Sequence, residues 1–245
     1  MQAKQSINDF VIKFANVNGT GSASANGMFA KAIFRMGIPV SPRNIFPSNI
    51  QGLPTWYEVR VSRDGYLGRR GGIDMMVSVN PQSFAKDVGE VEPGGYMLYD
   101  STKPLDLRHV RRDIHYLGIP LTEMCLREYT DSRQRQLFKN VIYVGALSAL
   151  LNIDFAILKD LVSEQFKGKE KLITPNIHAL EMGHQYATTH FECPLGIHLK
   201  AGEQTPKHIQ EFDQILMDGN TAAALGAVYA GATVAEAAVR ALRDV

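Results

Sequence analysis

The chain has 245 residues, and its 26 Lys and Arg residues nearly balance its 25 Asp and Glu residues, which leaves a formal charge of +1. Nucleic-acid-binding proteins usually carry a clear basic excess, so this balance argues against nucleic acid as the main partner. A hydrophobic content of 45% is ample for one large or two smaller domains. Cys125 and Cys193 are too few for a disulfide framework or for an iron–sulfur cluster, which needs about four ligands.

The cellular location is predicted from the N-terminus and from the length of the apolar stretches. The N-terminus has no apolar signal core, and the apolar stretches at 141–151 and 221–235 are too short to span a bilayer. We therefore expect a soluble cytoplasmic protein that does not insert into a membrane.

The stretch from Phe10 to Gly37 is the part around which the chain is organised. Phe10–Val17 is a near-continuous apolar run, typical of a strand buried on both faces of a parallel sheet. Gly19 and Gly21 then turn the chain, and Ser22 is predicted to be the N-cap of a helix with one apolar face. Free backbone N–H groups and the positive end of the helix dipole converge at such a turn, which predicts an anion cradle.

The composition around this turn narrows the type of anion. A dinucleotide-binding fingerprint needs a third glycine where this chain has Ser24, and an acid about 20 residues further on. No Asp or Glu occurs between Phe10 and Tyr57. The surroundings are formally positive and favour a polyphosphate, because they contain Lys13, Lys31, Arg35 and Arg43. The alternative, a tight turn that binds nothing, stays open.

Further strands and a short helix follow. Extended segments are predicted to begin at Ile38, at Tyr57, at Ile73 and at Tyr96, the last of them after Pro93-Gly94-Gly95, with a helix from Pro81 to about Val88. This order implies right-handed crossovers around the sheet. The predicted fold class is α/β, a Rossmann-like, largely parallel sheet with flanking helices, plus a helical C-terminal portion.

The helical portion begins at Ser132 with a broad apolar stripe. Asp154 is the predicted N-cap of a helix through Phe166, and Pro175 is predicted to start a helix through about His190. The stretch 192–207 indicates a linker, and the segment 218–221 caps a last helix of small residues, 222–230.

Several possible functional residues carry less weight. His178 and His184 are six residues apart, about 240° around a helix, so they do not share a face and predict no metal site. Neither a Gly-x-Ser-x-Gly elbow nor a Walker sequence occurs, so no catalytic residue is assigned. Trp56 could stack on a ligand or pack in the core, and the basic run 108–112 favours a solvated helix face over a second phosphate contact.

Three motifs carry a resemblance to a known family. They are the runs Asn16–Gly27, Ser48–Ser62 and Pro93–Ser101. Together they resemble the gamma domain of 2-oxoacid:ferredoxin oxidoreductases, as found at the N-terminus of the alpha subunit of 2-oxoglutarate-type enzymes. The resemblance implies a gamma-type α/β domain at 8–206. It also implies that 207–245 holds a linker and the truncated start of a thiamine-enzyme pyrimidine-binding-like domain, because Asp218–Thr233 resembles that start while the family's next Tyr-Pro-Ile-Thr-Pro run is missing.

The resemblance also implies a reaction. The family oxidatively decarboxylates a 2-oxoacid with coenzyme A to acyl-CoA, CO2 and reduced ferredoxin. This chain lacks the family's Gly-Asp-Gly thiamine motif and its cluster cysteines. Thiamine diphosphate, Mg2+ and a [4Fe-4S] cluster are therefore expected on a partner beta subunit in a hetero-oligomer that reduces ferredoxin.

Coenzyme A is the ligand that the resemblance implies for this chain. The residues expected at its pyrophosphate are Asn18, Gly19, Thr20, Gly21, Ser22 and Asn26, with Asn49 and Gln51 as weaker candidates at the same mouth. A free-standing nucleotide-binding or interaction module without catalysis stays open as the alternative. An NAD- or flavin-dependent dehydrogenase is disfavoured, because the third glycine and the ribose-binding acid are missing.

Overall fold

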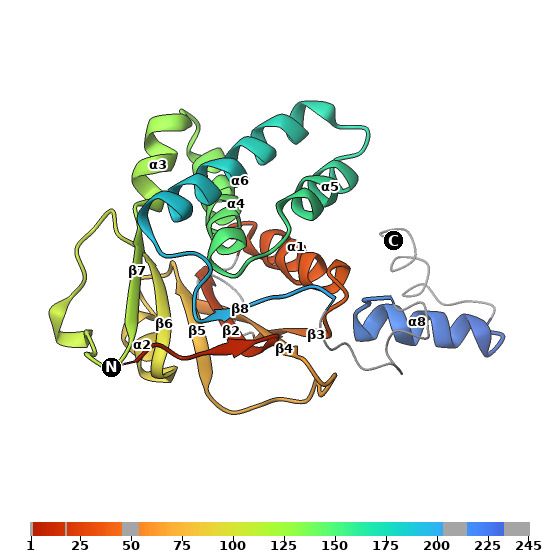
Figure 1. Ribbon diagram of the computed structural model, residues 1–245. Helices are drawn as coiled ribbons and strands as arrows, with labels where there is room; N and C mark the ends of the chain where they lie inside the picture. Colours follow the sequence, from red (N-terminus) through yellow and green to blue (C-terminus); the bar gives the residue numbers. More distant parts are fainter. Residues whose placement is uncertain (1, 18, 46–53, 203–214, 233–245) are drawn as a thin grey trace. The chain divides into compact units, whose positions relative to one another are not determined.

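The computed structural model describes residues 2–17, 19–45, 54–202 and 215–232 (Figure 1). The chain divides into two compact units, 1–206 and 207–245. The described part of the second unit contains the helix α8 (Gly219–Tyr229), and all the other elements below belong to the first unit. The identity of the second unit as the start of a thiamine-type domain stays a prediction.

A six-stranded sheet in the order β3-β4-β2-β5-β6-β7 forms the centre of the first unit. Its strands are β2 (Asp9–Val17), β3 (Val40–Ile45), β4 (Pro54–Ser62), β5 (Ile73–Ser78), β6 (Val91–Asp100) and β7 (His115–Ile119). β4 runs antiparallel to its neighbours β2 and β3, while the β2–β5, β5–β6 and β6–β7 pairs are parallel. The predicted α/β class with a largely parallel sheet is confirmed. A small parallel pair, β1 (Ser6–Ile7) and β8 (Ile197–His198), joins the two ends of the unit.

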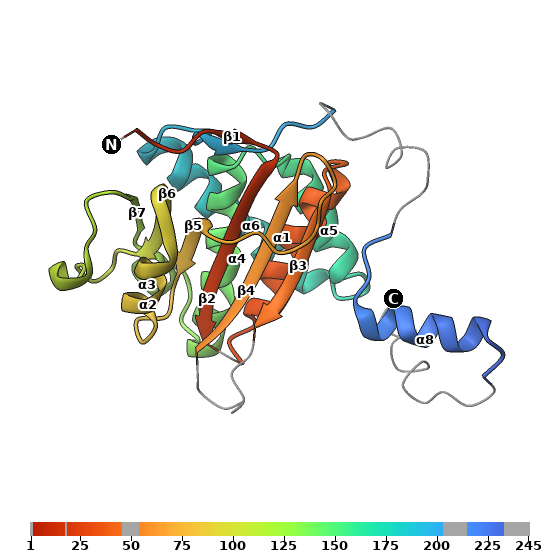
Figure 2. The same cartoon turned by 90° about the horizontal axis from the view of Figure 1, so that it is seen from below.

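The two faces of the sheet are covered differently. α1 (Ser22–Arg35), α4 (Ser132–Leu150), α5 (Phe155–Gln165) and α6 (Glu170–His190) lie together behind the strands in Figure 2. Phe10, Ile12 and Phe14 of β2 pack in the core that these helices share with the sheet. Val11 and Ala15 belong to a second, smaller core that includes residues of α2 (Phe84–Glu90). β2 is therefore buried on both faces, as its apolar run predicts.

Several predicted element starts are wrong. β4 begins at Pro54 rather than at Tyr57. α2 begins at Phe84 rather than at Pro81, and β6 begins at Val91 and runs through Pro93-Gly94-Gly95. α6 begins at Glu170, one turn before Pro175, because a proline in an early turn forfeits only one helical hydrogen bond. The remaining short helices are α3 (Leu121–Glu128) and the 3-10 turn η1 (Leu107–His109).

The run 108–112 does not form the predicted helix face. After η1 the chain is extended at Val110, and Arg108 pairs with Asp106. Arg111 instead ties the loop to the body of the domain, since its guanidinium donates to the carbonyl oxygens of Val88 and Val91 at 2.9 and 2.6 Å.

Two caps are as predicted. Asp154 caps α5 by accepting from the backbone N–H of Ala156 at 2.9 Å, and Asp218 caps α8 by accepting from Thr221 at the same distance. Ser22 is not the N-cap of α1. Gly21 holds that position with φ of 78°, so the helix begins at Ser22 without a side-chain cap.

Candidate functional site

The glycine loop, residues 19–22, lies at the carboxyl edge of the sheet, where the parallel strands end. Val17 is the last residue of β2 and pairs with Pro54, the first residue of β4, while Ile45 ends β3. Both ends of the segment that holds Asn49 and Gln51 are therefore at the edge that carries the glycine loop. Asn18, Asn49 and Gln51 themselves lie outside the described residues, and their roles stay predictions.

This position in the sheet is the one where open α/β proteins bind ligands. The helix after β2, α1, covers one face, and the helix after the neighbouring β5, α2, covers the other. The turns that follow β2 and β5 are joined, since Asn80 donates from Nδ2 to the carbonyl oxygen of Asn16 at 3.3 Å. Ligands of such folds bind at the carboxyl ends of strands where successive helices change face.

The backbone of the glycine loop is suited to a phosphate group. Gly19 and Gly21 have φ of 83° and 78°, values that side-chain-bearing residues rarely adopt. Both glycines lead directly into the N-terminus of the 14-residue α1, which has no acidic residue in its first turn and no side-chain cap. The first backbone N–H groups of a helix and its dipole attract an anion.

The side chains of the glycine loop turn toward the protein. The Thr20 hydroxyl donates to the carbonyl oxygen of Val17 at 2.8 Å, and Ser22 is buried. Asn140 of α4 donates to the carbonyl oxygen of Thr20 at 2.8 Å. A Cβ atom on Gly21 would overlap Cδ2 of Leu137, which comes from the first half of α4. The outward-facing groups of the loop are therefore those of its backbone.

Asn26 lies below the glycine loop rather than on it. Its side chain is 1% exposed; Oδ1 accepts from the Tyr143 hydroxyl at 2.6 Å, and Nδ2 donates to Oδ1 of Asn16 at 3.1 Å. These bonds brace the second turn of α1, and a direct contact of Asn26 with phosphate stays a prediction.

Two of the predicted cations, Lys13 and Arg35, have their charges paired away from the glycine loop. Lys13 is buried and pairs with Glu90, and Arg43 stands opposite Glu58 in the β3–β4 pair. Arg35 pairs with Glu164 in the last turn of α1, roughly 20 Å from its start at 1.5 Å per residue. The predicted positive surroundings are therefore wrong for Lys13 and Arg35, whose charges are paired with Glu90 and Glu164. For Lys31 and Arg43 the prediction stays a prediction. The predicted anion cradle therefore depends on the backbone N–H groups and the helix dipole.

A cation–acid cluster lies further along the same edge. Asp100 ends β6 and accepts from Lys139 of α4 at 3.1 Å and from Thr102 at 2.7 Å. Burial raises the pKa of Asp100, but the hydrogen bonds from Thr122 and Thr102 and the Lys139 charge outweigh it, so that the pKa lies below its usual value. The ion pair between Lys139 and Asp100 ties α4 to the end of β6.

Trp56 packs rather than facing open space. Its indole N–H donates to Oδ1 of Asp87 at 2.8 Å, and the ammonium of Lys86 lies 4.1 Å from the ring centroid. Burial raises the pKa of Asp87, although hydrogen bonds from Trp56, Ser83 and Ser78 oppose the rise. These contacts favour the packing interpretation of Trp56.

The histidines of α6 have separate partners. His178 contacts Glu128 at 2.9 Å, and Nδ1 of His184 contacts the Ser148 hydroxyl at 2.8 Å. His190 contacts its own helix at the carbonyl oxygen of Tyr186. Within the ranges that the structure describes, no group of three or more His, Cys, Asp or Glu side chains could hold a metal ion.

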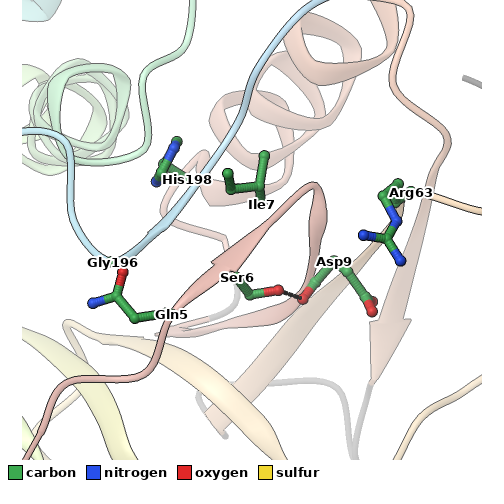
Figure 3. Close-up of a pocket in the computed structure, with 7 residues that line it drawn as sticks. All are labelled: Gln5, Ser6, Ile7, Asp9, Arg63, Gly196 and His198. Carbon is green, nitrogen blue, oxygen red and sulfur yellow. Dashed lines mark hydrogen bonds between the residues drawn. The ribbon is translucent and has the colours of Figure 1, made fainter. Parts of the chain in front are cut away.

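A cavity lies at the opposite edge of the sheet, and Figure 3 shows the residues that line it. This cavity of about 410 Å³ is lined by residues of β1 and β8 together with Asp9 and Arg63. Asp9 begins β2, so the cavity is roughly 26 Å from the glycine loop at about 3.3 Å per strand residue. It is therefore a separate feature from the predicted anion cradle. Among the described helices, none is long and apolar enough to cross a membrane.

The comparison with family models decides which family this fold and loop belong to. The model described as pyruvate ferredoxin/flavodoxin oxidoreductase matches residues 11–186. The chain belongs to this family. This match confirms the resemblance found in the sequence motifs. In this family member the matched region extends from β2 into α6.

Individual relatives match it at low identity. The alpha subunit of 2-oxoacid:ferredoxin oxidoreductase 2 of Aeropyrum pernix is 24% identical, over 76% of this chain and 35% of that subunit. The 2-oxoglutarate synthase subunit KorC of Archaeoglobus fulgidus is 25% identical, over 70% of this chain and 87% of that subunit.

A solved structure shows the same fold. The 2-oxoglutarate:ferredoxin oxidoreductase of Magnetococcus marinus matches with a TM-score of 0.78 at 24% identity, over 91% of this chain and 37% of that chain. This family member thus spans little more than a third of the length of the Aeropyrum and Magnetococcus chains.

The residues of α4 that hold the glycine loop were missed by the sequence analysis. Leu137, Asn140 and Tyr143 follow the loop by more than a hundred residues. Their signal in the sequence was the polar Asn140 within an apolar stripe, three residues after Leu137.

Proposed function

We propose that this chain supplies the coenzyme A-binding and assembly domain of a 2-oxoacid:ferredoxin oxidoreductase, with 2-oxoglutarate as the oxoacid. The whole enzyme oxidatively decarboxylates the oxoacid and transfers the acyl group to coenzyme A, and ferredoxin takes the electrons. The chain by itself is expected to bind coenzyme A without turning over the oxoacid.

The observation that carries this proposal is the glycine loop at the start of α1. It combines two positive-φ glycines, an uncapped helix N-terminus and a place at the carboxyl edge of β2 beside β5. A pyrophosphate fits such a turn because several backbone N–H groups can donate to its oxygens without a change of the loop.

The names of the relatives support the choice of ligand and oxoacid. The Magnetococcus enzyme is described with 2-oxoglutarate, coenzyme A and succinyl-CoA bound, and the Archaeoglobus subunit is named for 2-oxoglutarate. We carry both over to this chain as a proposal.

The proposal gives each predicted residue a role. The backbone of Gly19, Thr20, Gly21 and Ser22 donates to the pyrophosphate, and Asn18, Asn49 and Gln51 complete the mouth around it. Leu137, 42% exposed beside Gly21, offers apolar surface next to the phosphates. Asn26 holds the helix start in place.

The remaining cofactors belong to partner chains in this proposal. The described residues hold only two free cysteines, and Cys125 is buried with its pKa raised to about 11 by burial. Such a thiol is a poor cluster ligand, because metals bind the thiolate. A beta subunit is therefore assigned thiamine diphosphate, Mg2+ and the [4Fe-4S] cluster, in a hetero-oligomer that passes electrons to ferredoxin.

A matched pair of glycine variants tests the proposal. Gly19 and Gly168 both have positive φ, 83° and 79°, and in both an added Cβ meets nothing within 4 Å. Gly19→Asp puts a negative charge into the glycine loop, while Gly168→Asp makes the same change in the turn after α5. Titration calorimetry should show coenzyme A binding to the wild type and to Gly168→Asp, with affinity lower by at least about tenfold for Gly19→Asp because like charges repel.

NADH serves as the ligand control in the same titrations. The proposal expects no NADH binding, because the ribose-binding acid is missing. Equal coenzyme A affinity of Gly19→Asp and wild type, or no coenzyme A binding by the wild type, would contradict the assigned role of the loop.

A further inference from the structure

A closed ring of three hydrogen bonds lies directly beneath the glycine loop. The Tyr143 hydroxyl donates to Oδ1 of Asn26 at 2.6 Å, Nδ2 of Asn26 donates to Oδ1 of Asn16 at 3.1 Å, and Nδ2 of Asn16 donates back to the Tyr143 oxygen at 3.4 Å. Each side chain in the ring is at most 2% exposed. Three polar groups in a core are costly unless they satisfy one another, which these do.

The ring joins the two ends of the glycine loop to a third element. Asn16 is in β2 just before the loop, Asn26 is in the second turn of α1 just after it, and Tyr143 is in the middle of α4. The angle at which α1 leaves β2 is therefore fixed against α4. That angle sets the direction in which the first N–H groups of α1 point.

α4 contacts the glycine loop itself through two more side chains. Asn140 donates to the carbonyl oxygen of Thr20, and Leu137 fills the space at Gly21. Leu137 and Asn140 are three residues apart and contact the loop directly, while Tyr143, three residues further along α4, reaches the ring of hydrogen bonds. α4 thus holds the loop through Leu137 and Asn140, and it holds the residues on either side of the loop through Tyr143.

The Tyr143 ring is held independently of its hydroxyl. The ring packs at 5.8 Å between centroids from Phe14, which in turn packs edge-on against Phe29 at 5.2 Å. Removing only the hydroxyl therefore leaves the aromatic packing in place. It also leaves Oδ1 of Asn26 without its donor.

We propose that Tyr143 is a positioning residue for coenzyme A binding: its hydroxyl, through Asn26, fixes the start of α1 and thereby the direction of the N–H groups of the glycine loop. This inference rests on the proposed function of the loop. It adds a residue from a distant helix that does not touch the ligand.

A pair of tyrosine variants tests the inference in the 245-residue chain. Tyr143→Phe removes the positioning hydroxyl. Tyr96→Phe is the matched control, because Tyr96 is also buried and its hydroxyl accepts from the backbone N–H of Gly196 at 3.1 Å, away from the glycine loop. Calorimetry with coenzyme A should show an affinity about tenfold lower for Tyr143→Phe, because the N–H groups of the glycine loop are then misaligned. The affinity of Tyr96→Phe should be unchanged.

Hydrogen exchange separates positioning from general stability. Amides of residues 19–24 should exchange faster in Tyr143→Phe than in wild type and Tyr96→Phe, even where both variants lose similar thermal stability. Unchanged loop exchange together with unchanged affinity in Tyr143→Phe would overturn the inference. If Tyr143→Phe does not fold, Asn26→Ala breaks the same ring of hydrogen bonds. It is expected to lower the affinity for coenzyme A and to speed the exchange of amides 19–24. Wild-type affinity and wild-type exchange in Asn26→Ala would also overturn the inference.

The two proposals fail in different ways. A wild-type chain that does not bind coenzyme A contradicts the proposed function and with it the role of Tyr143 in that binding. A wild-type chain that binds, with Tyr143→Phe binding equally well, contradicts only the positioning role.

Discussion

The crossing of α4 and α6 allows the sharpest prediction about stability. Each helix has a glycine where the two helices meet, Gly145 in α4 and Gly183 in α6. A Cβ atom added to Gly183 would overlap the carbonyl oxygen of Ile142. A Cβ atom added to Gly145 would overlap the carbonyl oxygen of Leu180. Both obstacles are backbone atoms, which cannot move aside as a side chain can. Gly183→Ala therefore forces the helices apart.

The size of the effect follows from two opposing terms. Overpacking a tight core costs about 1–3 kcal/mol, and a backbone overlap belongs at the upper end of that range. Replacing glycine by alanine inside a helix gains about 1 kcal/mol. The net expectation for Gly183→Ala is a destabilisation of about 2 kcal/mol.

Gly27 provides the matched control. It lies inside α1, and an added Cβ there meets nothing within 4 Å, so Gly27→Ala should stabilise the chain by up to about 1 kcal/mol. Urea unfolding followed by far-ultraviolet circular dichroism measures both changes as shifts of the midpoint. A Gly183→Ala variant as stable as wild type would refute the close crossing.

Three further outcomes follow from the polar groups. Asp100→Asn should destabilise the chain by about 1–3 kcal/mol at neutral pH. The folded-state pKa of Asp100 is lowered, so its contribution is present above the unfolded pKa and fades as the pH falls through the folded pKa. The urea midpoints of variant and wild type should therefore converge as the pH falls below about 4. Trp56→Phe should lower the free energy of unfolding by about 1–2 kcal/mol, because the hydrogen bond to Asp87 is lost, and should leave the affinity for coenzyme A unchanged. A large loss of affinity would instead support stacking of Trp56 on the ligand. Cys125 should resist a maleimide at pH 7.5 in the folded chain and react in urea, and fast labelling of the folded chain would contradict its burial.

The central βα unit could be predicted because its signals are local. An apolar run followed by Gly19 and Gly21 and an apolar-faced helix specifies a buried strand, a turn and a helix within 28 residues. The same locality explains why the caps of α5 and α8 are as predicted, since each depends on one acidic side chain and an N–H two or three residues further on.

The parts that depend on distant partners could not be predicted in this way. β4 pairs antiparallel with β2, a strand that ends 37 residues earlier in the chain. The ion pairs of Lys13 and Arg35 use partners 77 and 129 residues away. The support of the glycine loop by Tyr143 and Asn140 comes from equally distant positions.

The measurement that tests the account most directly is a two-dimensional nitrogen–proton spectrum of the labelled chain during addition of coenzyme A. Gly19 and Gly21 have amide signals in the separate glycine region, and Ser22 starts α1. If the glycine loop binds coenzyme A, saturable shifts are expected to concentrate on its amide signals. Coenzyme A that binds but shifts only signals of the cavity at the opposite edge, such as Ile7 and His198, would contradict it.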